Sequence, residues 1–189
     1  MNTPAHILLG AAVFGRGGEP RLLWAAILGA VAPDASLYVM AGVSLYLLAI
    51  PPKVVFDELY FSESWQTIFA IDNSLFVWGA LLGVALWRRW PSGIAFAGAG
   101  LLHLALDFPL HADDGRPHFW PLSDWVFASP VSYWDSTHHA VWVAPVTVLI
   151  CVIAYAMIWR AQIRPIGLAA FGALLVAEFW VLRQWLLFF

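Results

Sequence analysis

Long apolar segments separated by short polar connections dominate the chain. Residues 68–87, 93–110, 138–159 and 166–188 each approach the roughly 20 apolar residues that a membrane-spanning helix needs. The pattern therefore predicts four spanning helices in these segments.

Two further apolar segments near the N-terminus depart from this simple pattern. Residues 22–50 are long enough to span, but Ala32-Pro33-Asp34 interrupts them, and a proline removes a backbone donor and kinks a helix. Residues 4–14 are too short to cross, so we expect a half-helix packed against the first part of 22–50. The predicted fold is all-α: a polytopic membrane bundle of about five spanning helices plus the half-helix, forming one domain over residues 1–189.

The composition supports this fold class. Hydrophobic residues make up 62% of the chain and charged residues 11%, whereas soluble domains are about half apolar and a quarter charged. A single cysteine excludes an internal disulfide and a cysteine cluster for zinc. The N-terminus lacks a basic segment, so we expect no cleaved signal peptide. No basic patch suggests nucleic-acid binding.

Charge alternates between successive connections. Lysine and arginine concentrate on the cytoplasmic side of membrane proteins. This rule predicts that the acidic connections 51–67 and 111–137 face outward, and that the arginine-rich connections face the cytoplasm. The arginines concerned are Arg16, Arg21, Arg88, Arg89, Arg160 and Arg164.

Ionisable residues within the apolar segments are the main functional signal, because such residues are costly in a bilayer and usually mark a function. At a rise of about 1.5 Å per residue, six of them lie at one level, roughly 15–22 Å from the cytoplasmic connections. They are His6, Asp34, Asp72, His103, Asp107 and Glu178.

His103 and Asp107 are four residues apart and share one helix face. With His6 and Asp34 they offer two imidazoles and two carboxylates, a set that suits Zn²⁺, Mn²⁺ or iron. A bound metal activates water for hydrolysis of a phosphoester or an acyl bond. A His–Asp pair that serves packing alone is the alternative. Small residues at Gly93, Ala97, Gly98 and Gly100 predict close packing of this helix.

The connection after this helix adds further candidates. His111 follows Asp107 by four residues and extends the same face if the helix continues past Pro109. Asp114 and His118 are candidate catalytic residues or ligands, Asp72 is a candidate general base, and Arg116 is a candidate contact for an anionic substrate. A solvated loop is the alternative for all the loop residues.

The order of these motifs resembles the LexA-regulated, membrane-bound metal-dependent hydrolases of bacteria. The chain shows an early His6, then Pro33-Asp34, Asp72-Asn73-Ser74-Leu75, His103-x-x-x-Asp107 and Trp120-Pro121, all within about residues 1–125. The resemblance implies a hydrolase of the bacterial inner membrane.

Two positions depart from the family pattern. Ser36 replaces the second aspartate of Pro-Asp-x-Asp, and Asn73 replaces the histidine of Thr-His-Ser-Leu. Both losses affect metal ligands that the resemblance implies. The site could therefore hold one metal, be rebuilt with Asp72, His111 or Asp114, or be inactive.

We favour an enzyme that uses a divalent metal, zinc or manganese first. We expect its small or lipid-linked substrate to enter from the outer face. His6, Asp34, His103, Asp107 and His111 are the expected metal ligands. The rivals are a metal- or proton-coupled transporter, which also uses broken helices and carboxylates near the bilayer midplane, and a non-catalytic protein with a structural polar cluster.

Overall fold

The computed structural model describes residues 1–15 and 19–188, and every regular element within them is helical. Five helical segments are long and apolar enough to cross a membrane, which confirms the predicted all-α class: Pro20–Leu47, Glu63–Trp87, Pro91–Leu110, Ala140–Arg160 and Pro165–Phe188. The α-helices are α1 (Thr3–Phe14), α2 (Pro20–Gly42), α3 (Pro52–Val54), α4 (Glu63–Asp72), α5 (Leu75–Trp87), α6 (Pro91–Asp107), α7 (Ala140–Arg160) and α8 (Pro165–Phe188).

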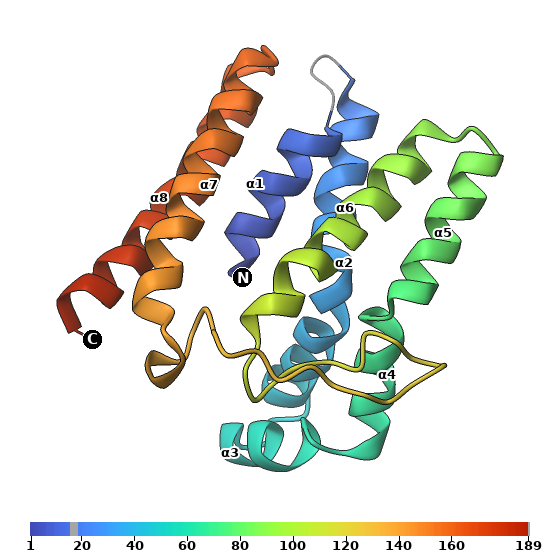
Figure 1. The fold of residues 1–189 in the computed structure, drawn as a ribbon, viewed down its shortest axis with the longest axis vertical. Helices are drawn as coiled ribbons and strands as arrows, with labels where there is room; N and C mark the ends of the chain where they lie inside the picture. The colour runs from blue at the N-terminus through green and yellow to red at the C-terminus, as the bar shows by residue number, and fades with distance from the viewer. Residues whose placement is uncertain (16–18, 189) are drawn as a thin grey trace.

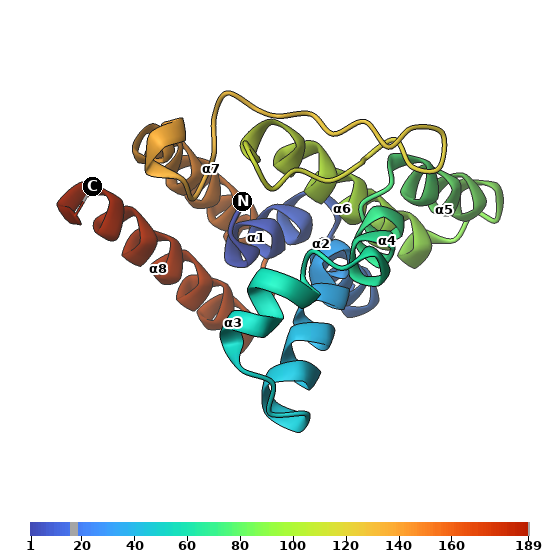
Figure 2. The same cartoon turned by 90° about the horizontal axis from the view of Figure 1, so that it is seen from below.

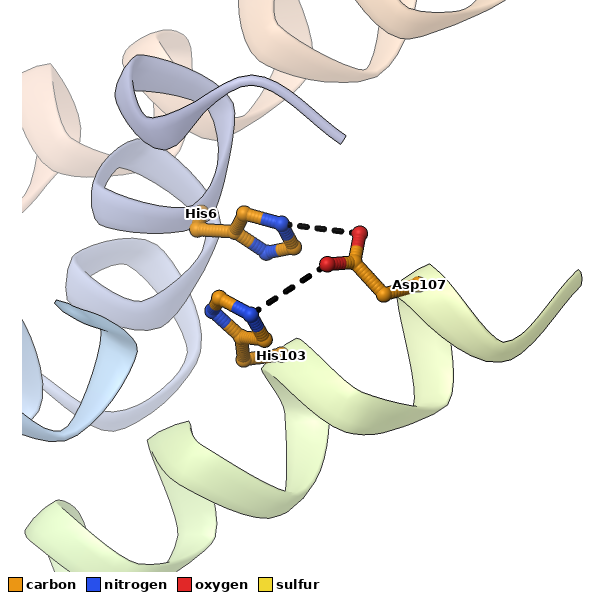
Figure 3. Close-up of side chains that lie close together, drawn as sticks. All are labelled: His6, His103 and Asp107. Atoms are coloured by element: carbon orange, nitrogen blue, oxygen red, sulfur yellow. Dashed lines mark hydrogen bonds and ion pairs between the residues drawn. The ribbon is translucent and has the colours of Figure 1, made fainter. Parts of the chain in front are cut away.

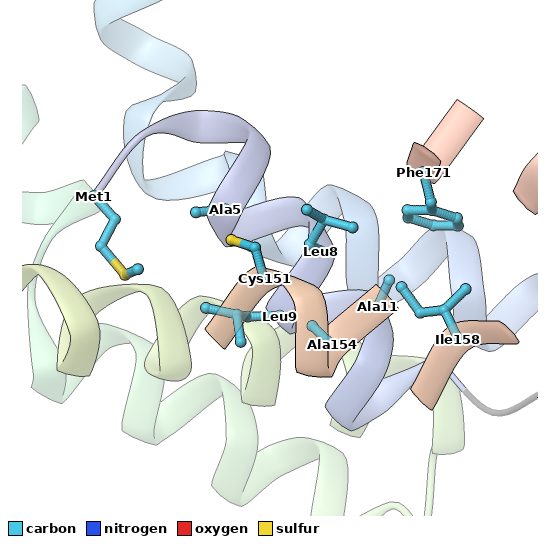
Figure 4. Close-up of a cluster of buried hydrophobic side chains, with 9 residues drawn as sticks. All are labelled: Met1, Ala5, Leu8, Leu9, Ala11, Cys151, Ala154, Ile158 and Phe171. Carbon is cyan, nitrogen blue, oxygen red and sulfur yellow. The ribbon is translucent and has the colours of Figure 1, made fainter. Parts of the chain in front are cut away.

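The short helix α1 lies in the middle of the bundle, between α7 and α8 on one side and α2 and α6 on the other (Figure 1). Pro4 lies in its first turn, where a missing N–H costs nothing, and the N–H of Gly15 closes its end on the Ala11 carbonyl. Its side chains form an apolar cluster with residues of α7 and α8 (Figure 4). The half-helix predicted at residues 4–14 is therefore a central core element.

Helices α2 and α6 cross closely because small residues meet at the crossing. A Cβ atom at Gly29 would lie 2.0 Å from the Phe96 carbonyl oxygen. Ala26 and Ala30 of α2 form a buried cluster with Ala99 of α6. On other faces of α6, Gly98 meets the Phe14 ring and Gly100 meets the Trp78 ring. The predicted small-residue packing of α6 is confirmed.

The predicted interruption at Pro33 is wrong. Helix α2 continues through Pro33, which is buried inside it. The break lies elsewhere, between α4 and α5, where Asn73 ends one helix and Ser74 caps the next by accepting from the N–H groups of Phe76 and Val77. Pro33, Asn73 and Ser74 are all buried. Backbone groups that lose their helical hydrogen bonds at these positions therefore face protein and not lipid.

The connections alternate between the two ends of the bundle. Those joining α5 to α6 and α7 to α8 lie at one end, whereas the 111–139 connection and α3 lie at the other (Figure 1). Figure 2 shows the 111–139 connection running from α7 past α6 to α5. Backbone bonds attach it there, with the Leu75 N–H donating to the His118 carbonyl at 2.9 Å. Arg16, one of the arginines of the predicted charge pattern, lies outside the described residues.

Candidate metal centre and cavity

The α6 pair forms as its spacing predicts. His103 and Asp107 lie one turn apart, with the imidazole Nε2 3.3 Å from the carboxylate Oδ2. Both residues are buried. A carboxylate in such surroundings needs a positive partner, since burying an unpaired charge is very costly.

Helix α1 brings His6 to the same carboxylate. The His6 Nε2 lies 3.0 Å from Asp107 Oδ1. The His6 and His103 rings are stacked, with centroids 3.7 Å apart and planes inclined by 16°. Figure 3 shows both rings directed at Asp107, each facing a different carboxylate oxygen. Two imidazoles and one carboxylate therefore converge from two helices.

The orientation of His103 suits metal binding. Its Nδ1 lies 2.7 Å from the Ala30 carbonyl, to which only an N–H can donate. This bond places the ring proton on Nδ1 and leaves a lone pair on Nε2, the arrangement in which histidines bind metals. Nε2 is buried and has no hydrogen bond among the described residues. His6, His103 and Asp107 each offer a ligand atom within 4.8 Å of the others.

Asp34 and a positive charge complete the surroundings. Asp34 Oδ2 lies 3.7 Å from His103 Nε2, and its side chain is 28% exposed. The amino group of Met1 contacts Asp107 Oδ1. The site thus already places one cationic group against Asp107, as its negative charge requires.

His111 links the cluster to the 111–139 connection. Helix α6 ends at Asp107, and a 3-10 turn over Phe108–Leu110 follows, so the predicted continuation past Pro109 does not occur. His111 nevertheless reaches back, with Nε2 3.4 Å from Asp107 Oδ2 and Nδ1 2.9 Å from Asp114 Oδ1. Trp134 holds the other Asp114 oxygen through its Nε1–H at 2.9 Å.

These contacts set the charge of His111. Burial by itself would lower the pKa of this imidazole, but the carboxylates of Asp107 and Asp114 raise the pKa to about 9. Burial likewise acts to raise the pKa of Asp114, but the contact with His111 outweighs it and the pKa is lowered. His111 is therefore a cation at neutral pH, held between two anions.

A cavity of about 200 Å³ lies above the cluster. Polar groups predominate in its wall, which α1, α2, α6 and the 111–139 connection form together with Tyr60 and Asn73. The wall includes the predicted residues Asp34, Asp107, His111, Asp114, Arg116 and His118. The structure therefore brings most of the sequence-predicted candidates around one space.

Two of the six ionisable residues predicted at one level lie away from the cluster. Among the described residues, the cavity wall includes Asn73 but neither Asp72 nor Ser36. Glu178 is buried in α8 and accepts from the Asn2 side chain at 3.1 Å. Asp72 is the last residue of α4, and Glu178 belongs to a separate polar contact with Asn2.

Several tyrosines of the cavity wall were missed by the sequence reasoning. Tyr38, Tyr60 and Tyr133 all line it. Tyr38 contacts Thr3, with the two hydroxyl oxygens 2.5 Å apart, and Tyr60 accepts a hydrogen bond from Arg116 at 2.7 Å. No motif marks them, because membrane proteins place many tyrosines at the interface for anchoring alone.

The fold and this cluster define a helical bundle of the membrane-spanning type with a buried histidine–aspartate centre that opens into a polar cavity. No protein-family model, curated protein or solved structure matches the chain.

Proposed function

We propose that the protein is a membrane-embedded, metal-dependent hydrolase of the bacterial inner membrane. The observation that carries the proposal is the convergence of His6, His103 and Asp107, with the His103 Nε2 lone pair directed into the cluster. Asp34 is the fourth ligand. Nitrogen and oxygen ligands in this mixture favour zinc or manganese.

When bound, such an ion lowers the pKa of a coordinated water and polarises the bond to be cleaved. The residues of the chain supply position and protons. The Ala30 carbonyl fixes the His103 ring. His111 lines the cavity and holds a proton at Nδ1, 2.9 Å from Asp114 Oδ1. His111 is therefore the group that protonates the leaving oxygen. The resemblance of the motif order to bacterial membrane hydrolases supports the same reaction class.

Metal content tests the proposal directly. Elemental mass spectrometry on detergent-purified protein should find a stoichiometric divalent metal in the wild type, and less than a tenth of it in His103→Ala and Asp107→Asn. His139→Ala and Asp124→Asn are matched controls, because both residues are exposed and belong neither to the cluster nor to the cavity wall. They should keep the metal.

Wild-type protein that remains free of metal after reconstitution would overturn the proposal and favour a structural polar cluster. If the proposal holds, metal-loaded wild-type protein should hydrolyse an ester, and His103→Ala should lose that activity. Metal-coupled flux into vesicles without hydrolysis would assign the protein to transport instead.

A further inference from the structure

Arg116 is placed in the cavity wall by aromatic groups. Its guanidinium carbon lies 4.3 Å from the centre of the Phe69 ring and 5.1 Å from that of the Tyr60 ring. One of its nitrogens donates to the Tyr60 hydroxyl at 2.7 Å. Cation–π contacts of this kind hold a guanidinium in place without neutralising it.

The positive charge of Arg116 has no anionic partner within residues 1–15 and 19–188. The carboxylates that share the cavity, Asp34, Asp107 and Asp114, are instead in contact with histidines. A guanidinium carries five N–H donors, so most of its donors remain available after the bond to Tyr60. A half-buried, immobilised and unneutralised arginine in a cavity wall is a binding site for an anion.

His118 adds a second polar group to the same wall. Its Nδ1 donates to the Arg116 carbonyl at 2.8 Å, which ties the two residues together. Its Nε2 is buried and has no hydrogen bond among the described residues. The residue itself is 4% exposed. A buried nitrogen of this kind is normally satisfied by a partner.

The geometry points to a phosphoryl group as the ligand of Arg116, so we propose that the substrate is a phosphoester. This inference rests on the proposed hydrolase function and names its substrate class. A carboxylic ester is neutral and offers Arg116 no charge. A phosphoester has several charged oxygens, so one can face the metal cluster at Asp107 while another faces Arg116 across the same cavity.

The cavity size limits what binds. Its volume of about 200 Å³ is below the roughly 300–1,000 Å³ of pockets for drug-sized ligands. It therefore holds a phosphorylated headgroup or a small phosphoester rather than a large substrate. In the reaction, water forms a new P–O bond, the ester P–O bond breaks, and the proton of water ends on the leaving oxygen.

Binding of inorganic phosphate to the metal-loaded protein tests this inference by calorimetry. Arg116→Gln should raise the Kd for phosphate about tenfold or more, since a hydrogen bond to a charged group is lost. The Kd for phosphate of Arg116→Lys should lie between those of wild type and Arg116→Gln, because lysine keeps the charge but lacks the planar guanidinium. Metal content should stay at the wild-type level in both variants.

Arg88→Gln is the matched control, because Arg88 also stacks on an aromatic ring, 5.0 Å from the Trp87 centroid, but lies outside the cavity wall. It should leave the phosphate Kd unchanged. Tyr60→Phe removes only the hydroxyl that positions Arg116 and should weaken phosphate binding less than Arg116→Gln. This variant keeps the test valid if Arg116→Gln does not fold.

The outcomes separate the two proposals. Wild-type protein that holds no metal after reconstitution would overturn the proposed function. Protein with metal that does not bind phosphate, or whose Arg116→Gln variant binds it as well as wild type, overturns the phosphoester inference alone. Displacement of bound phosphate by dioctanoyl phosphatidic acid is then compared with displacement by glycerol 3-phosphate. The first compound represents a lipid headgroup and the second a soluble ester. Preferential displacement by either one supports the inference and identifies the source of the phosphoryl group.

Discussion

Asp107 is the residue at which α1, α6 and the 111–139 connection meet. Its two oxygens face His6, His103 and His111 at 3.0, 3.3 and 3.4 Å. Removing one partner from such a buried network leaves the others unsatisfied, which costs more than the interaction itself contributes. Substitutions at Asp107 therefore affect folding as well as metal binding. Asparagine is the best replacement, because it keeps the shape of the side chain and removes its charge.

The sequence predicts this cluster well at the level of residues. The spacing of His103 and Asp107 and the depth of His6 and Asp34 place all four residues together. The pairing of His111 with Asp114, and that of Arg116 with Tyr60, depends on the course of the 111–139 connection, whose described regular structure is one 3-10 turn at Ser136–His138. Asp72 and Asn73 are neighbours at a helix end, and only the position of the break decides which of them faces the cavity.

His118 gives a prediction for pH dependence. Burial lowers the pKa of this imidazole below its usual 6.5, so the folded protein binds the proton less tightly than the unfolded chain does. The free energy of unfolding should therefore fall as the pH drops below about 6.5. Above that pH His118 is neutral in both the folded and the unfolded state and causes no such loss. The thermal unfolding midpoint in detergent, measured from pH 8 to pH 5, reports this loss.

His118→Asn is the comparison, because its amide keeps a donor for the Arg116 carbonyl and does not titrate. The variant should lose less stability than the wild type between pH 8 and pH 5. Identical pH profiles for the two proteins would contradict the assignment of the lowered pKa.

At the scale of elements, the crossing of α2 and α6 governs the site. Gly29 touches the Phe96 backbone, and the adjacent Ala30 carbonyl orients His103. The sequence pattern predicts these helices but places the break at Pro33, whereas the chain breaks at Asn73–Ser74. A proline can stay within a helix when its neighbours satisfy the freed backbone groups, whereas a serine cap starts a helix by its own side chain.

Gly29→Ala should destabilise the protein by about 1–3 kcal/mol, the usual cost of overpacking. Its methyl group would collide with the Phe96 backbone and push α2 away from α6, so the metal content should also fall. Thermal unfolding in detergent and elemental analysis measure the two effects.

Gly83→Ala is the matched control, since a Cβ at Gly83 meets nothing within 4 Å. It should leave both stability and metal content at or slightly above the wild-type level. Equal behaviour of the two alanine variants would show that the α2–α6 crossing does not limit stability.

At the scale of the whole molecule, the charge pattern and the alternation of connections predict an orientation. Residues of the 111–139 connection line the cavity. This connection lies at the opposite end of the bundle from the connections that join α5 to α6 and α7 to α8 (Figure 1). Under the positive-inside rule this end faces outward. The orientation follows from the sequence alone, because it depends on charge counts and not on packing.

Cysteine labelling tests the orientation with few changes, because the native Cys151 is fully buried and serves as an unreactive background. A membrane-impermeant maleimide should label Ser123→Cys in intact cells. It should label Ser92→Cys, at the other end of the bundle, only after the cells are permeabilised. The opposite pattern would place the cavity on the cytoplasmic side.

The central position of α1 has a consequence for biogenesis. His6 leaves the ribosome early, yet its hydrogen-bond partner Asp107 follows 101 residues later, and the α7 and α8 side chains that enclose α1 follow later still. A short apolar helix inside a bundle has no span of its own to anchor it during insertion. The cluster of His6, His103 and Asp107 is therefore enclosed only after the last helices have been made. Under the proposed function, we expect metal to bind after translation.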